Sequence, residues 1–165
     1  MTAALTTLLA RANAEQSAGN SAAALVLYER VLPQLVVEQF PHERAKVLFH
    51  MAQLARYEGQ GDRALQLYDE LLALTETLKD HRAHGLSVAM RGQLIFMRGD
   101  QEAGLKGMVG GLEELRASGA GEAEHLTCHT RYFSRRIKRD LYERCVREAT
   151  EDVVLREILL EAGGC

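Results

Sequence analysis

Tryptophan is absent from this chain of 165 residues, and proline occurs only twice. Because proline interrupts helices and central strands, its scarcity favours long unbroken elements. No run of β-branched residues alternates with polar ones as a strand requires, whereas good helix formers dominate the composition. No segment reaches the about 20 apolar residues of a membrane span, and the first residues lack the pattern of a signal peptide. We therefore predict one all-α domain, residues 1–165, outside the membrane.

Cysteine is also scarce, and Cys128, Cys145 and Cys165 form no paired motif. Disulfide frameworks and zinc sites usually show an even number of cysteines at short, regular spacings. Three cysteines at wide spacings predict reduced thiols and a cytoplasmic protein.

The charge of the chain is small overall but unevenly placed. The formal net charge is −3, yet residues 131–147 carry a net charge of +5, which leaves −8 on the rest. Interleaved arginine and aromatic side chains can hold nucleic acid through phosphate contacts and stacking. The sequence pI of about 6.1 speaks against that interpretation, so pairing with the acidic body, with solvent or with an acidic protein partner stays open. The basic segment is represented by Arg131, Arg135, Arg136, Lys138 and Arg139.

Glycine recurs at a 40-residue step, at Gly19, Gly59 and Gly99. A gapless repeat predicts a stack of like units, because one unit of this size cannot bury its apolar face alone. The same step relates small and apolar positions on both sides of the glycines: Ala12, Ala52 and Gly92; Leu25, Leu65 and Leu105; Leu32, Leu72 and Leu112.

Each repeat is predicted to be a pair of antiparallel helices joined at its glycine, where a left-handed conformation ends the first helix. The repeats span about residues 2–40, 41–80 and 81–118, and the second helix of the first repeat is expected over 21–40. Additional glycines in the second helix of the third repeat predict either a weak helix or the close approach of another helix. Residues 121–165 depart from the pattern and are predicted to form a degenerate pair of capping helices.

The repeats resemble the tetratricopeptide repeat (TPR) family, in a variant longer than the common period of about 34 residues. The family has a small residue in the first helix, a glycine at the turn, and an alanine and an aromatic residue in the second helix. The resemblance covers about residues 5–115 and implies a right-handed superhelix, a TPR-like solenoid of helical hairpins, whose first helices line a concave groove. The pattern occurs as Ala12, Gly19, Ala24 and Tyr28, as Ala52, Gly59, Ala64 and Tyr68, and more weakly as Gly92, Gly99, Gly104 and Met108.

The resemblance also implies which side chains face the groove. One phase of the first helices gives three amides, Asn13, Gln53 and Gln93, which can both donate to and accept from an extended peptide backbone. The alternative is that these amides are solvated on an exposed helix face. Neighbouring groove positions are Lys46, Phe49, Arg56, Tyr57, Phe96 and Met97.

Two groups of histidines have metal-ligand chemistry. His125, Cys128 and His129 share one face of a predicted helix, but the sequence shows no fourth ligand, and His81 and His84 show no carboxylate partner. The chain also lacks phosphate-binding glycine loops and nucleophile motifs. We predict no metal, no cofactor and no catalytic residue.

The sequence thus predicts a non-enzymatic module that binds a partner peptide or helix in its groove, as a scaffold or regulator. The alternative is a nucleic-acid-associated accessory protein that uses the basic segment. The last predicted helix, 150–162, either caps the stack or packs on a second copy of the chain as a homo-oligomer contact.

Overall fold

Glycines in the left-handed backbone region join the helices of this protein. In the computed structural model, which describes residues 1–137, 140–141, 144 and 157–158, Gly19, Gly59 and Gly99 have φ values of +80°, +73° and +108°. Because L side chains rarely adopt this region, glycine is the residue that these turns favour. The three turns predicted from the 40-residue step are confirmed. Gly119 follows the same rule with φ of +69°, whereas Lys79 adopts φ of 54° with a side chain.

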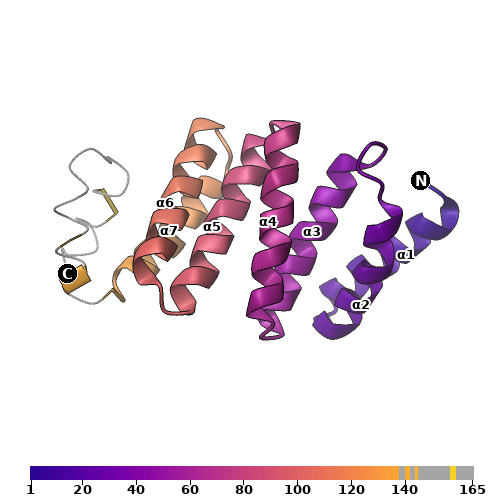
Figure 1. The fold of residues 1–165 in the computed structure, drawn as a ribbon, viewed down its shortest axis with the longest axis horizontal. Coiled ribbons are helices and arrows are strands. Elements are labelled where there is room, and N and C mark those ends of the chain that lie inside the picture. The colour runs from indigo at the N-terminus through magenta and orange to yellow at the C-terminus, as the bar shows by residue number, and fades with distance from the viewer. Residues whose placement is uncertain (138–139, 142–143, 145–156, 159–165) are drawn as a thin grey trace. The chain divides into compact units, whose positions relative to one another are not determined.

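Every regular element in the described residues is a helix, which confirms the all-α prediction for that part of the chain (Figure 1). The chain divides into two compact units, Met1–Lys79 and Asp80–Cys165, and the division falls at the predicted start of the third repeat. None of the described helices has the length and apolar character to cross a membrane. The first unit contains α1 (Ala3–Ser17), α2 (Ser21–Val31), the 3-10 helix η1 (Leu32–Gln34), α3 (Pro41–Tyr57) and α4 (Gly61–Leu78). The second contains α5 (His81–Met97), α6 (Gln101–Ala117) and α7 (Glu122–Ser134).

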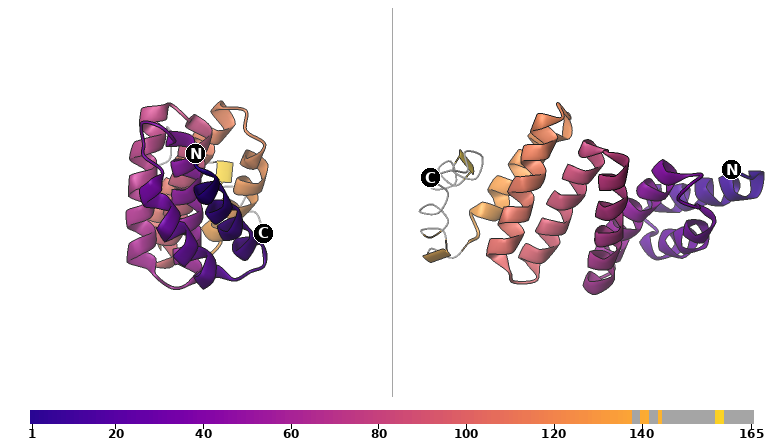
Figure 2. Two further views of the ribbon diagram at one scale, coloured as in Figure 1. Left: turned by 90° about the vertical axis from the view of Figure 1, so that its right-hand side faces the viewer. Right: turned by 45° about the horizontal axis from the view of Figure 1, so that its top comes forward.

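In the first unit, each helix packs on the next in sequence, α1 on α2, α2 on α3 and α3 on α4 (Figure 2). The small residues of the repeat make this packing close, since an alanine lets a neighbouring helix approach. Ala12, Ala24, Ala52 and Ala64 are all completely buried, as are the aromatic residues Tyr28 and Tyr68. The small and aromatic positions of the repeat are therefore core positions of this unit.

The prediction of a helix over 21–40 is wrong, because α2 ends well before residue 40. Pro33 has no N–H and its ring crowds the preceding turn, so the helix tightens into η1 and stops. Arg44 of α3 then donates to the carbonyl oxygens of Leu32 and Leu35 at 3.0 and 3.1 Å. The carbonyl oxygen of Leu32 also accepts from the N–H of Leu35 in η1, so Arg44 adds a second bond there and ties the end of α2 to α3.

In the second unit, α5 and α6 touch through their backbones. A Cβ added to Gly92 would lie 2.6 Å from the backbone nitrogen of Met108, and one added to Gly104 would overlap the backbone of Phe96. Such distances are far below van der Waals contact, so only glycine fits at these positions. Of the two interpretations of the glycine-rich helix, the structure supports the close approach of another helix. Ser87 and Leu94 of α5 are buried as well, and four further buried residues of this helix recur at helical spacing, three of them small and one aromatic: Gly85, Ala89, Gly92 and Phe96.

The core of the second unit forms where α6 meets α7. An apolar stripe of α6 is fully buried there, together with Leu126 of α7. Of the predicted helix 150–162, the structure describes Glu157 and Ile158, and the rest lies outside the described residues. Ile158 is completely buried in this core, and Arg116 donates to Glu157 at 3.2 Å. These contacts fit the capping interpretation. The buried stripe of α6 is Leu105, Met108, Leu112 and Leu115.

Matched glycine substitutions test the backbone contact. Gly104→Ala is expected to lower the free energy of unfolding by about 1–3 kcal/mol, because the new methyl group overpacks the interface. Gly110 lies in the same helix with nothing within 4 Å of a Cβ, so Gly110→Ala is expected to raise stability by about 0.5–1 kcal/mol through helix propensity. Urea denaturation followed by circular dichroism measures both. Equal effects of the two substitutions would contradict the contact.

Candidate partner-binding surface

The side chains predicted to face a groove divide between the two units. Those of the first unit lie on α1 and α3, and those of the second lie on α5. Helix α7 follows α5 at the repeat step, so that Phe133 is the counterpart of Gln93. Each unit therefore offers its own surface made of two first helices, and the two surfaces differ in chemistry.

In the first unit, a chain of polar contacts links α1, α2 and α3. The hydroxyl of Tyr28 lies 2.6 Å from Oδ1 of Asn13 and 2.7 Å from Oε1 of Gln16. Nε2 of Gln16 lies 3.0 Å from Nδ1 of His50. The imidazole of His50 stacks on the Tyr28 ring with centroids 5.7 Å apart. Asn13 is therefore held by a buried tyrosine, so its amide belongs to an internal network as well as to the surface.

Burial sets the protonation of this network. Burial raises the pKa of Tyr28 to about 12, so the phenol keeps its proton at neutral pH. Burial, helped by the positive charge of Lys46, lowers the pKa of His50 below its ordinary value of 6.5. A neutral imidazole accepts at Nδ1, which lets the Gln16 amide donate to it and use its oxygen for Tyr28. The hydroxyl has a single proton, which it donates to Oδ1 of Asn13 or to Oε1 of Gln16.

The second repeat has a different arrangement at the equivalent positions. Tyr68 corresponds to Tyr28 and Arg56 to Gln16 at the 40-residue step. A guanidinium has no acceptor, and the fully buried Tyr68 hydroxyl has no hydrogen-bond partner among the described residues. Burial raises the pKa of Tyr68, although the charge of Arg56 opposes that shift. Arg56 also stacks over the exposed ring of Tyr57 at 4.8 Å.

The remaining predicted residues of the first unit lie on α3. Lys46 is exposed, whereas Phe49 and Gln53 are half-buried. Phe49 packs edge-on against the His50 ring, with centroids 6.1 Å apart. Lys46, His50 and Gln53 are spaced at i, i+4 and i+7, so they share one face of the helix. The sequence analysis missed His50, although this spacing could have found it.

In the second unit, a depression opens to solvent between α5 and α7. It has a volume of about 380 Å³ and is lined by Gln93 of α5 and by Cys128, His129, Tyr132 and Phe133 of α7. Tyr132 is 55% exposed, and the guanidinium of Arg136 lies 3.5 Å from its ring centroid. The predicted groove residue Gln93 therefore lies in a concave surface, beside an aromatic pair that the sequence analysis did not place there.

Phe96 and Met97 have separate positions. Phe96 is 6% exposed and packs edge-on against Phe133, with centroids 5.2 Å apart. Its side chain lies in the core, and not on the surface that the resemblance implied, because Gly104 brings the backbone of α6 against it. Met97, the last residue of α5, is 62% exposed.

The cluster of His125, Cys128 and His129 is a surface feature of α7. The two imidazole rings lie 4.4 Å apart and tilted, and Cys128 is an exposed free thiol. Within the described part of the chain, no group of three or more histidine, cysteine or acidic side chains is placed to hold a metal ion.

The basic segment is partly neutralised by acidic side chains. Arg131 lies 3.8 Å from Glu157, and Arg144, farther along, lies 2.5 Å from Glu102. Arg135 and Arg136 are exposed. Lys138 and Arg139 lie outside the described residues. The two exposed arginines follow directly on the end of α7, beside the depression.

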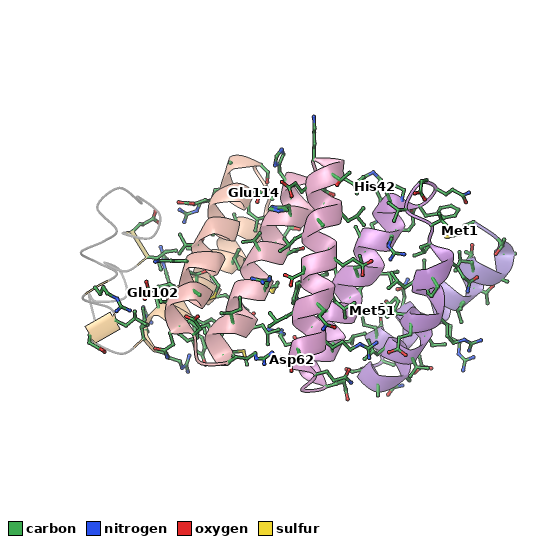
Figure 3. All side chains as sticks on the ribbon, in the orientation of Figure 1. Met1, His42, Met51, Asp62, Glu102 and Glu114 are labelled. Atoms are coloured by element: carbon green, nitrogen blue, oxygen red, sulfur yellow. The ribbon has the colours of Figure 1, made fainter. Side chains whose placement is uncertain are left out.

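Glu114 supplies the carboxylate that the sequence did not show for the histidines at the start of α5. Its two oxygens lie 3.1 Å from Nδ1 of His81 and 2.7 Å from Nδ1 of His84. Figure 3 shows Glu114 and Glu102 at opposite ends of α6. The two contacts tether the start of α5 to the end of α6.

Comparisons with protein-family models, with curated proteins and with solved structures found no match to this chain. The candidate surface is therefore identified from the geometry of the described residues.

The stability of the first unit is expected to depend on pH through His50. Its pKa in the folded state lies below the unfolded value of 6.5, so the unfolded chain binds the proton first as the pH falls. Stability is then fully present above about pH 6.5 and decreases below it. Thermal unfolding of the wild type and of His50→Gln, recorded between about pH 7.5 and about pH 5, should show a smaller decrease for the variant.

The exposed His42 of the same helix provides the control. His42→Gln removes an imidazole that takes no part in the network and should keep the wild-type slope. If both variants follow the wild type, the network does not hold His50 neutral.

Proposed function

We propose that this protein is a TPR-like helical repeat protein that binds a segment of a partner polypeptide on the surface of its first helices. In this proposal the repeats form a right-handed superhelix, and the protein serves as a cytoplasmic scaffold or regulator and not as an enzyme. The exposed free thiol of Cys128 fits a reducing compartment.

The observation that supports this proposal best is the depression at Gln93. The resemblance implied that this amide faces a groove, and in the structure it lines a concave surface together with α7. A side-chain amide can donate and accept at once, which suits the backbone of an extended peptide. Exposed aromatic residues such as Tyr132 are typical of the residues that carry binding energy at protein interfaces.

The depression is open to solvent and has a volume of about 380 Å³, so in this proposal it takes one large side chain of a peptide while the peptide backbone runs outside. The polar side chains of α1 and α3 offer a second surface, of different chemistry, in the first unit.

A library of displayed random peptides of about 12 residues, selected for binding to the full chain, tests the proposal without assuming the sequence of the partner. Peptides enriched on the wild type should bind the Gln93→Ala, Tyr132→Ala double variant at least about tenfold more weakly, because one amide and one aromatic contact are lost. Fluorescence polarisation of the enriched peptides gives the dissociation constants.

Val26→Ala is the matched control, since Val26 is 56% exposed and lies on α2, a second helix. Its binding should equal that of the wild type. Enriched peptides that bind the double variant as well as the wild type would place the site elsewhere, and a failure to enrich any peptide would overturn the proposed function.

A further inference from the structure

We infer that the depression between α5 and α7 takes an aromatic or large aliphatic side chain from an acidic segment of the partner protein. This inference rests on the proposed function and adds the chemistry of the ligand. Three features of the second unit carry it: the lining of the depression, the distribution of charge around it, and the way Arg136 is held.

The lining of the depression is mainly apolar. The ring of Phe133 packs edge-on against the buried ring of Phe96, and Tyr132 packs edge-on against Phe133 with centroids 5.5 Å apart. Two rings in this arrangement form a rigid wall, because each is fixed by a contact that does not depend on the ligand. His129 and the thiol of Cys128 extend the wall along α7. An apolar side chain of matching size loses its water there without leaving a buried charge unpaired.

Arginine is the commonest charged residue in the two segments that border the depression. Residues 81–97 and 125–137, which are the two segments that border it, contain five arginines and no aspartate or glutamate. Among these arginines, Arg82 pairs with Glu122, and Arg131 lies 3.8 Å from Glu157. Arg135 and Arg136 therefore give this border of the depression a positive charge that attracts a negatively charged ligand.

Arg136 joins the two features. Its guanidinium lies over the ring of Tyr132, which keeps the cation at the mouth of the depression, and Arg135 is exposed next to it. A guanidinium stacked in this way still presents its edge to a carboxylate, with which it can form paired hydrogen bonds. Two exposed arginines can pair with a few carboxylates of a peptide whose apolar side chain occupies the depression. A nucleic acid needs many phosphate contacts for useful affinity at physiological salt.

Four peptide libraries of about 12 residues, displayed against the full chain, test the inference. Their random positions encode acidic residues with aromatics, neutral residues with aromatics, acidic residues without aromatics, and basic residues with aromatics. The acidic aromatic library should yield the tightest peptides, by at least about tenfold over each of the others. Their affinity should fall about fivefold between about 50 mM and about 500 mM salt.

Variants and a local chemical readout tie the peptides to the depression. Tyr132→Ala and the double variant Arg135→Gln, Arg136→Gln should each weaken binding about fivefold to tenfold, whereas Arg30→Gln on α2 should not. Alkylation of Cys128 by a maleimide, followed on its own peptide by mass spectrometry, should slow when the ligand is bound. Melting temperatures confirm that each variant is folded.

The outcomes separate this inference from the proposed function. Neutral or basic aromatic peptides that bind as tightly as acidic ones would overturn the acidic ligand and leave peptide binding intact. Acidic peptides that bind without protecting Cys128 would overturn the site. If no library yields a binder, both the inference and the proposed function fail. Single-stranded DNA that displaces the acidic peptides at physiological salt would assign the two arginines to nucleic acid instead.

Discussion

Direct contact between the backbones of α5 and α6 is the constraint on which the surface of the second unit depends. Gly92 and Gly104 let the two helices approach until a single methyl group would not fit between them. Phe96, whose backbone lies against Gly104, is buried in the core with the apolar side chains of α6, where its ring packs edge-on against Phe133. Phe133 in turn forms part of the wall beside Tyr132. The wall of the depression therefore depends in part on two glycines that are not among its lining residues.

The first unit solves a different problem, the burial of a tyrosine hydroxyl in each repeat. A phenol removed from water is unfavourable unless its hydroxyl finds a partner. In the first repeat the amides of Asn13 and Gln16 provide partners, and His50 completes the chain of contacts. In the second repeat Arg56 stands at the equivalent position and cannot accept a hydrogen bond. The same core position thus has a satisfied hydroxyl in one repeat and an unsatisfied one among the described residues of the next.

Charged side chains are unevenly paired in the second unit. Carboxylates of α6 and of the described C-terminal residues pair with arginines, as Glu102 does with Arg144. The arginines at the end of α7 remain exposed beside an apolar depression. Under the inference drawn above, this border attracts acidic partner segments and repels basic ones. In the proposed function, this is how the protein selects a polypeptide segment.

The helical class, the turns and the buried stripes could be predicted from the sequence, because they depend on residues within one or two helical turns of each other. Glycine at the repeat step predicted three left-handed turns that the structure confirms. Asp80 is the N-cap of α5, a position that aspartate favours, and its carboxylate accepts a hydrogen bond from the N–H of Ala83. The early end of α2 could also have been predicted, because Pro33 interrupts a helix at that position.

Which side chains meet across helices could not be predicted, and it was settled by the packing of the folded chain. Periodicity names the face of a helix that is buried but not the residue that lies opposite, because that depends on how closely and at what angle two helices pack. Nothing in the sequence indicated that Glu114 would reach His84, or that the histidine stacked on Tyr28 would be His50. For the same reason Gln93 and Phe96, which lie within one turn of α5, were assigned to one surface. The packing of α6 placed Phe96 in the core and kept Gln93 in the depression.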